Sequence, residues 1–297
     1  MNGSESSVRF VWRRGFFVAA KWDLNAIRAC LGGSKVTIRL IVSDLDGTLL
    51  SPEHQLTQPV KEAVAAFTKR GGLFTFATGR PLLTAASFER ELTLGMPYIL
   101  CNGSVIAQKG EVMESASFLA GDVNALLADA SQADLDAFLF REDGVFVFRP
   151  SEAVHRYEEK ERVRCIQLDE GDNEWKEAYV QKVILIGDMS VIRQVWALHE
   201  PVHARFAAFQ SEADYWEIMS SGQSKGTALR KIAERLNIKR EEIMALGNQL
   251  NDLDMLQYAG IGVAVANAHE ELKAEADYVC KQSYGEGVLE AMAKFCL

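Results

Sequence analysis

The sequence predicts an α/β protein, with a doubly wound parallel-sheet core that is interrupted by an inserted α+β unit. Two nearly continuous apolar runs, at residues 38–42 and 73–77, each end in polar residues, which is typical of strands buried on both faces of a parallel sheet. An amphipathic stretch separates these runs, as a doubly wound fold requires. The middle of the chain carries a hairpin pattern instead, which predicts an antiparallel sheet of its own.

The core elements follow one another along the chain. Residues 57–70 carry apolar side chains at helical spacing, with Pro59 near the start and Gly71 just past the end, where helix termini favour these residues. The remaining core elements expected are strands at 98–101, 243–246, 261–265 and 277–280 and helices at 227–236 and 252–258. Strands connected through helices in this way form a parallel sheet.

The inserted unit is expected in the middle of the chain. Two apolar-rich runs flank a turn sequence at residues 141–144, and further strands are expected at 180–186 and 205–209. Together with two helical stretches, this pattern predicts an antiparallel sheet with helices on one side. The predicted division of the chain is an N-terminal extension at 1–35, a discontinuous core at 36–117 and 218–297, and the inserted unit at 118–217.

The first 35 residues differ from the rest of the chain. They carry six basic side chains against two acidic ones and end in a Gly-Gly-Ser break. An Arg-rich, acid-poor start is a transit-peptide signature, but the apolar run at 16–20 is too short for a secretory signal. A targeting leader, a non-catalytic extension of uncertain order and an over-extended start site all remain open.

The bulk composition narrows the possible partners. The chain is 48% hydrophobic and 25% charged, an ordinary soluble profile, and it lacks an apolar run near the roughly 18 residues that span a bilayer. A net charge of -9 argues against a nucleic-acid binder, because phosphate contacts need clustered Lys and Arg. The five cysteines form no C-x-x-C pair, so neither a zinc site nor a disulfide framework is expected. We therefore expect a cytoplasmic protein that binds neither nucleic acid nor membrane.

Polar residues follow four of the expected strands. Ligands bind beyond the carboxyl ends of the strands in an open parallel sheet, so these residues are the candidate site. They are Asp44 and Asp46, then Thr78 and Arg80, then Asn102, and finally Asn248, Asn251 and Asp252. Lys225, at the start of a later helix, can join them.

Two carboxylates two residues apart at a strand end can serve one metal and one substrate. Asp44 would attack phosphorus and Asp46 would move the proton. A Mg²⁺ ion bound by Asp44 and a phosphoryl oxygen would remove the repulsion between the carboxylate and the phosphoryl group. Thr78 and Lys225 can hold the other phosphoryl oxygens. The pattern therefore predicts transfer of a phosphoryl group to Asp44 and hydrolysis of the aspartyl phosphate by water. The protein is thus expected to be a phosphatase of small phosphorylated metabolites, with sugar phosphates, nucleotides and phosphorylated cofactors all open as substrates.

The order of these motifs closely resembles the haloacid dehalogenase (HAD)-like hydrolase superfamily, and within it the Cof-type phosphatases. The segments that carry the likeness are Asp44-Leu45-Asp46-Gly47-Thr48-Leu49, Thr78-Gly79-Arg80, Asn102-Gly103, Ser224-Lys225-Gly226, Gly247 with Asn251-Asp252 and Met255, and the closing stretches 265–268, 276–279 and 285–288. The resemblance covers residues 38–295. It implies a Rossmann-like core and makes the inserted unit a C2-type cap that closes over the site and selects the substrate.

The resemblance also implies roles for single residues. Asp44 would be the nucleophile, and Asp46 the acid/base and a metal ligand through its carbonyl. Thr78, Lys225 and Asn251 would hold the phosphate or substrate.

Two further residues and one departure complete the predicted site. Arg80 and Asn102 are candidate substrate contacts. The family usually has Gly-Asp where this chain has Gly247-Asn248, and that aspartate is a direct Mg²⁺ ligand. Asn248 can still offer an amide oxygen, and Asp252 can take over directly or through water.

Three alternatives remain open at this stage. Asn248 could leave a phospho-ligand-binding protein with little or no turnover, and a sugar phosphomutase would share the aspartyl-phosphate step. The third is a serine hydrolase, because Gly222-Gln223-Ser224-Lys225-Gly226 spells G-x-S-x-G. Asp252 or Asp254 and then His269 follow Ser224 in the required order.

Overall fold

The computed structural model describes residues 37–169 and 171–296, and its core is a parallel sheet. Five strands lie in the order β16-β15-β14-β1-β2, each parallel to its neighbours. Their bounds are Leu40–Ser43 (β1), Leu73–Phe76 (β2), Ile243–Gly247 (β14), Ile261–Ala264 (β15) and Tyr278–Val279 (β16). The extension expected at residues 1–35 lies outside the described residues.

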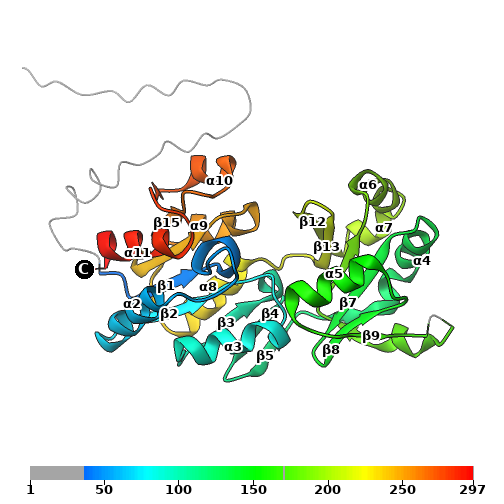
Figure 1. The fold of residues 1–297 in the computed structure, drawn as a ribbon, viewed down its shortest axis with the longest axis horizontal. Helices are drawn as coiled ribbons and strands as arrows, with labels where there is room; N and C mark the ends of the chain where they lie inside the picture. Colours follow the sequence, from blue (N-terminus) through cyan, green and yellow to red (C-terminus); the bar gives the residue numbers. More distant parts are fainter. Residues whose placement is uncertain (1–36, 170, 297) are drawn as a thin grey trace, which may run out of the picture. The chain divides into compact units, whose positions relative to one another are not determined.

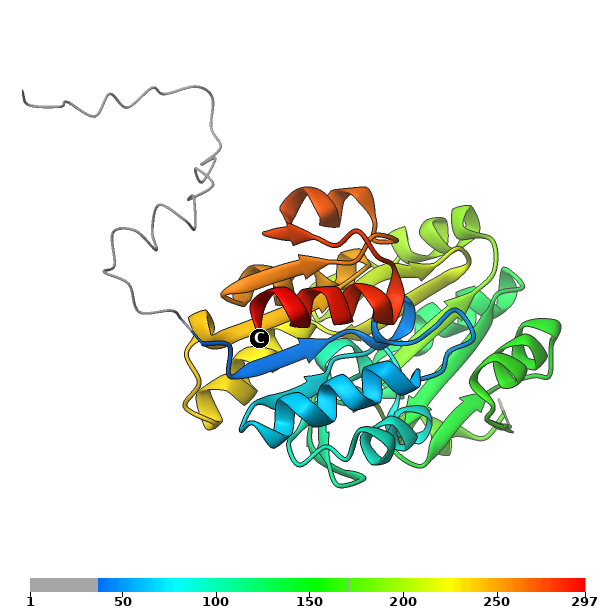
Figure 2. The same cartoon turned by 60° about the vertical axis from the view of Figure 1, so that its left-hand side comes forward.

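Helices cover both faces of this sheet, which confirms the doubly wound core. One face packs against α2, α3 and α11, and the other against α8, α9 and α10 (Figures 1 and 2). Their bounds are Gln58–Lys69 (α2), Leu82–Leu92 (α3), Lys225–Arg235 (α8), Leu253–Tyr258 (α9), Glu270–Glu275 (α10) and Tyr284–Phe295 (α11). Neighbouring residues of β1 explain the two layers, because Ile41 joins the first apolar cluster and Leu40 and Val42 join the second.

The third expected core strand belongs only partly to the parallel sheet. β3 (Tyr98–Leu100) meets the end of β2 through one parallel bridge between Ala77 and Ile99. It then pairs with β4 (Val105–Gln108), which pairs with β5 (Glu111–Ser115), in a separate antiparallel sheet.

The inserted unit contains the expected hairpin, formed by β7 and β8, within a six-stranded sheet. The strand order is β12-β13-β11-β7-β8-β9, and all pairs are antiparallel except β8 with β9. The strands are Asp136–Arg141 (β7), Gly144–Val147 (β8), Cys165–Gln167 (β9), Lys182–Ile186 (β11), Phe206–Glu212 (β12) and Tyr215–Ser220 (β13). A short pair, Phe118–Leu119 (β6) and Tyr179–Val180 (β10), lies beside it.

The expectation that helices cover one side of this sheet is wrong. Leu139 of β7 packs in a cluster with α4 and α6, whereas its neighbours Phe138 and Phe140 pack with α5. Both faces of β7 are therefore apolar and need a helix. The helices are Asn124–Gln132 (α4), Glu152–Glu161 (α5), Met189–Ala197 (α6) and the short Glu200–His203 (α7).

Two neighbouring stretches of chain join the core to the inserted unit. One runs from the end of β5 to the start of β6, the other from the end of β13 to the start of α8. Ser220 Oγ donates to the Ala116 carbonyl at 2.8 Å, so the two crossings lie side by side. The boundaries at 118 and 217 stay a prediction.

Short helical turns complete the chain, several of them at strand ends. They are Leu45–Leu49 (η1), Cys101–Gly103 (η2), Ala120–Val123 (η3), Asn173–Glu177 (η4), Arg240–Glu242 (η5) and Leu250–Asp252 (η6). Within the described residues, no helix has the length and apolar character needed to cross a bilayer. The four cysteines there are free thiols.

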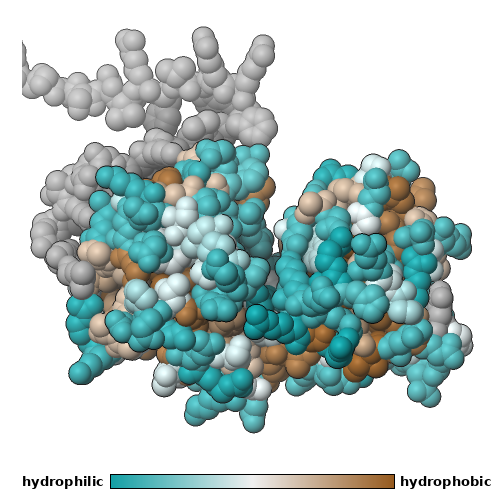
Figure 3. Space-filling view, viewed as in Figure 1, coloured by the Kyte–Doolittle hydropathy of each residue, from teal (hydrophilic) through white to brown (hydrophobic). Residues whose placement is uncertain are grey.

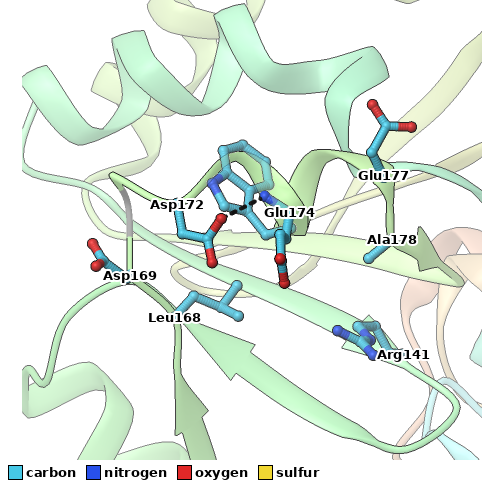
Figure 4. Close-up of a pocket in the computed structure, with 8 residues that line it drawn as sticks. Arg141, Leu168, Asp169, Asp172, Glu174, Glu177 and Ala178 are labelled. Atoms are coloured by element: carbon cyan, nitrogen blue, oxygen red, sulfur yellow. Dashed lines mark hydrogen bonds between the residues drawn. The ribbon is translucent and has the colours of Figure 1, made fainter.

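The inserted unit has a hollow of about 340 Å³, and Figure 4 shows the residues that line it. Acidic side chains dominate its wall, including Asp169, Asp172, Glu174 and Glu177, with Arg141 as a basic member. None of its lining residues is among the polar strand-end residues singled out above. The candidate chemistry therefore lies elsewhere.

Candidate active site

The carboxyl ends of β1, β2, β3 and β14 meet at a cavity of about 390 Å³ between the core and the inserted unit. Figure 3 shows hydrophilic residues along both walls of the hollow between the two. Seven of the residues singled out in the sequence line this cavity: Asp44, Asp46, Thr78, Arg80, Asn102, Asn248 and Asn251. The other two lie behind Asp44: Lys225 donates a hydrogen bond to Asp44, and Asp252 accepts a second one from Lys225.

Asp44 is a buried carboxylate with one engaged and one free oxygen. It follows β1, and its backbone amide donates to the Leu246 carbonyl of β14 at 2.9 Å. Lys225 Nζ donates to Oδ1 at 2.6 Å, while Oδ2 is buried without a hydrogen-bond partner. Burial raises the pKa of Asp44 to about 7, the Lys225 charge opposes that rise, and the Asp252 carboxylate adds to it. A buried oxygen without a partner is costly, so this position favours a bound cation or electrophile.

The raised pKa of Asp44 predicts a pH-dependent stability. An ordinary aspartate has a pKa of 3.8, so between that value and about 7 the folded protein holds a proton that the unfolded chain releases. Folding stability should therefore fall as pH rises through this window. In excess chelator, Asp44→Asn should melt above the wild type at pH 8, by about 3 °C for roughly 1 kcal/mol, and match it near pH 4. A difference independent of pH in differential scanning fluorimetry would contradict this assignment.

Lys225 links Asp44 to Asp252 inside the core. Its side chain is 1% exposed, and Nζ lies 2.6 Å from both Asp44 Oδ1 and Asp252 Oδ1. The remaining oxygen of Asp252 accepts the backbone amides of Asn248 and Gln249 at 2.8 and 3.0 Å. Asp252 is therefore committed to positioning Lys225 and the loop after β14, and a cation there would compete with three donors.

Asp46 lies nearer the solvent and is held by positive charge. Arg80 donates to both of its oxygens at 2.7 Å, and His54 Nδ1 lies 2.9 Å from Oδ1. Arg80 also contacts Glu161 of α5 at 3.2 Å. Burial raises the pKa of Asp46, but the hydrogen bonds and charge of Arg80 outweigh burial, so the net pKa lies below the ordinary value. Asp46 is thus ionised while Arg80 holds it.

Asn248 offers an amide oxygen beside these carboxylates. Its Oδ1 accepts a hydrogen bond from Thr48 Oγ1 at 3.1 Å. Its Nδ2 approaches Gly47 so closely that a Cβ on residue 47 would lie 2.2 Å away, and Gly47 has φ +80°. Only glycine fits this turn. Hard oxygens are what Mg²⁺ takes in proteins, so the Asp44 carboxylate and the Asn248 amide oxygen fit such a cation.

Hydrogen bonds join the other strand ends. Asn251 Nδ2 donates to the side-chain oxygen Oδ1 of Asn102 at 2.9 Å. The backbone N–H of Asn102 donates to the backbone carbonyl of Thr78 at 3.0 Å. Asn102 has φ 52°, and a Cβ on Gly103 would meet the Ser224 carbonyl at 2.0 Å. The turn after β3 is therefore pressed against the start of α8, which carries Lys225.

Sequence reasoning missed a buried ion pair that the inserted unit contributes to the cavity. Lys182 Nζ donates to Glu217 and to the Gly79 carbonyl, both at 2.9 Å, and Asn102 Nδ2 donates to Glu217 at 3.0 Å. Lys182 starts the apolar strand β11, and Glu217 interrupts β13. A charge in an otherwise apolar strand was the available signal, because such residues are rarely buried without a partner.

The hydrogen bonds that a serine hydrolase needs among Ser224, His269 and Asp254 are not formed. Ser224 caps α8, where its Oγ accepts the Thr227 amide at 3.1 Å. His269 Nδ1 accepts the Glu271 amide and Asp254 Oδ2 accepts the Gly226 amide. All three residues line a neighbouring hollow, but each is engaged with backbone rather than with the others.

Comparison with known proteins gives one consistent result. A family model for haloacid dehalogenase-like hydrolases matches residues 41–292. The 5-amino-6-(5-phospho-D-ribitylamino)uracil phosphatase YcsE of Bacillus subtilis is 28% identical over 263 residues, which cover 88% of this chain and 97% of that protein. The HMP-PP phosphatase of Escherichia fergusonii is 29% identical over 247 residues, covering 80% and 87%. A solved haloacid dehalogenase-like hydrolase from Bacteroides thetaiotaomicron aligns with a TM-score of 0.78 at 26% identity, covering 87% and 99%.

Proposed function

Since the chain belongs to the haloacid dehalogenase-like hydrolase family, we propose that it is a Mg²⁺-dependent phosphatase that releases phosphate from small phosphorylated metabolites through an aspartyl phosphate on Asp44. The observation that carries this proposal is the state of Asp44. Lys225 holds one oxygen, while the other is buried and free. A nucleophile needs such an uncommitted oxygen in a fixed position.

Asp44 Oδ2 would form a bond to phosphorus as the bond to the leaving-group oxygen breaks. Lys225 keeps the carboxylate oriented, and Thr78, which lines the same cavity, would hold a phosphoryl oxygen together with Asn251. Water would then attack the phosphorus and return Asp44 to its free form.

Asp46 would supply the proton to the leaving group and later take one from the attacking water. It is held ionised by Arg80, so it must first lose that partner. A phosphoryl dianion in the cavity competes with Asp46 for Arg80. Substrate binding would therefore release Asp46 to accept a proton.

Mg²⁺, when bound, would reduce the repulsion between the Asp44 carboxylate and the phosphoryl oxygens. Asn248, the carbonyl of Asp46 and Asp44 Oδ1 would hold it, which leaves Asp44 Oδ2 for the bond to phosphorus. Asp252 would not bind the metal directly, and would instead position Lys225 and the backbone N–H of Asn248 through hydrogen bonds.

The neutral side chain of Asn248 predicts weak metal binding. Asn248→Asp adds the missing negative charge and should lower the Mg²⁺ concentration for half-maximal rate by about tenfold or more. Asn237→Asp adds the same charge at an exposed position beyond α8 and serves as the matched control. A Mg²⁺ titration of p-nitrophenyl phosphate hydrolysis measures both. An unchanged requirement in Asn248→Asp would remove Asn248 from the metal site.

A substrate panel tests the proposed function against a phospho-ligand-binding role. Purified protein should release phosphate from some small phosphorylated metabolites with Mg²⁺ and lose this activity in chelator. Binding of phosphorylated compounds in calorimetry without release of phosphate, in both wild type and Asn248→Asp, would favour the binding protein.

A further inference from the structure

The active-site cavity continues into a second, larger hollow. This hollow, of about 920 Å³, lies between β12–β13 of the inserted unit and the start of α8 and α9. The two share five residues at their junction: Asn102, Ser211, Glu212, Gln249 and Asn251. If phosphorus is at Asp44, the rest of the substrate can extend through this junction into the larger hollow.

Positive charge in both spaces is already neutralised. Throughout the described residues that line them, each lysine and arginine contacts a carboxylate: Arg80 with Asp46 and Glu161, Lys160 with Glu212, Lys182 with Glu217, and Lys225 with Asp44 and Asp252. Five acidic and three lysine or arginine side chains line the first cavity. A second phosphate would have to separate an ion pair and would face surplus carboxylates.

Uncharged hydrogen-bonding groups, by contrast, are free at the junction. Ser211 Oγ and Asn251 Oδ1 are both buried without a hydrogen-bond partner. Ser211 lies where the pairing of β12 with β13 shifts register between Gln210 and Glu212, which marks a β-bulge. Bulges next to active sites re-aim side chains, and this one places a hydroxyl in the passage. A substrate hydroxyl or N–H would satisfy both atoms.

The wall beyond the junction is also uncharged for the most part. It combines the apolar side chains of Phe209, Met219 and Leu250 with the amides of Gln210, Gln223 and Gln257. Such a wall suits a polar but uncharged organic group.

From these contacts we propose that the site selects phosphomonoesters whose leaving group is uncharged and carries hydroxyl or N–H groups, read by Ser211 and Asn251, and rejects substrates with a second phosphate. This inference rests on the proposed function. The Lys160–Glu212 pair is the barrier to the second phosphate, because Glu212 lies at the junction and already forms an ion pair with Lys160.

Three six-carbon compounds separate charge from hydroxyl recognition: sorbitol 6-phosphate, sorbitol 1,6-bisphosphate and n-hexyl phosphate. With Mg²⁺, kcat/KM should be at least about tenfold higher for sorbitol 6-phosphate than for either of the others, the scale of one net hydrogen bond or one unfavourable charge contact. Hydrolysis of p-nitrophenyl phosphate reports the phosphatase itself.

Substitutions then assign the two effects. Glu212→Gln frees Lys160 and should raise kcat/KM for the bisphosphate relative to the monophosphate by about tenfold. Glu200→Gln, at an exposed site on α7, is its matched control. Ser211→Ala should reduce the preference for sorbitol 6-phosphate over n-hexyl phosphate by about tenfold, whereas Ser131→Ala on the exposed face of α4 should not change it.

The possible failures are distinguishable. No release of p-nitrophenol would defeat the proposed function and this inference with it. Release of p-nitrophenol with equal kcat/KM for all three six-carbon compounds would overturn the inference alone. A bisphosphate preference in the wild type, or unchanged ratios in Glu212→Gln and Ser211→Ala, would overturn it as well.

Discussion

Asp44→Asn is expected to lower kcat for p-nitrophenyl phosphate on the order of 10⁶-fold, the scale observed when a catalytic nucleophile is removed. Asparagine keeps the shape of the side chain, and its oxygen can still accept the Lys225 hydrogen bond. The variant should therefore fold, and its circular dichroism spectrum should match that of the wild type. Asp143→Asn, in the turn between β7 and β8, is a matched change outside the cavity and should keep full activity.

Two outcomes would contradict the nucleophile assignment. One is Asp44→Asn protein with more than a few per cent of wild-type rate. The other is that Ser224→Ala loses phosphatase activity while Asp44→Asn keeps it, which would favour the serine-hydrolase alternative. Ser224→Ala removes only the N-cap of α8, so we expect it to lower the free energy of unfolding by about 1 kcal/mol and to leave kcat unchanged.

Lys225→Met is expected to be the most destabilising substitution in the site. Lys225 is 1% exposed and neutralises two buried carboxylates, so its loss leaves Asp44 and Asp252 facing each other without a cation. Breaking a buried pair in this way costs about 3–5 kcal/mol. Urea unfolding in chelator should show this loss, and phosphatase activity should fall as well because Asp44 is no longer held.

A second variant separates charge from folding. Lys225→Met with Asp252→Asn removes one of the two stranded charges and should recover much of the lost stability without recovering activity. Equal stability of Lys225→Met and the double variant would mean that the buried charges do not determine the cost. Recovered activity in the double variant would mean that Lys225 does not hold the nucleophile.

The sequence carried enough information for the core because its strands are short, apolar and followed by polar residues. Leu40–Ser43 and Leu73–Phe76 are buried on both faces, and this produces the continuous apolar runs that predict parallel strands. The pairing of the third strand, β3, could not be predicted in this way. Tyr98–Leu100 has the same apolar character but shares only one bridge with the parallel sheet and then pairs with β4. Which strand it pairs with depends on β4 and not on its own residues.

The inserted unit was predicted less completely for a similar reason. Its hairpin follows from local turn chemistry, whereas the position of α5 depends on distant packing against Phe138 and Phe140. The residues that this unit adds to the cavity carry no motif. Glu161, Lys182, Glu212 and Glu217 acquire meaning only from their partners across the fold, and the bulge that places Ser211 becomes visible only in the strand register.

The roles predicted for the strand-end residues stay predictions, but their contacts show what Asp252 and Arg80 can do. Asp252 was grouped with the metal ligands, and its contacts now favour a positioning role. Arg80 was a candidate substrate contact, and its two bonds to Asp46 make it the partner that a phosphoryl group must displace.

The most direct test is chemical trapping of the covalent intermediate. Wild-type protein turning over p-nitrophenyl phosphate with Mg²⁺ is quenched with borohydride, which reduces an acyl phosphate to an alcohol, and its peptides are mapped by mass spectrometry. The account expects reduction at Asp44 and at no other carboxylate, and none in Asp44→Asn. An unmodified Asp44 during turnover, or a covalent adduct on Ser224, would contradict the central claim that Asp44 is the nucleophile.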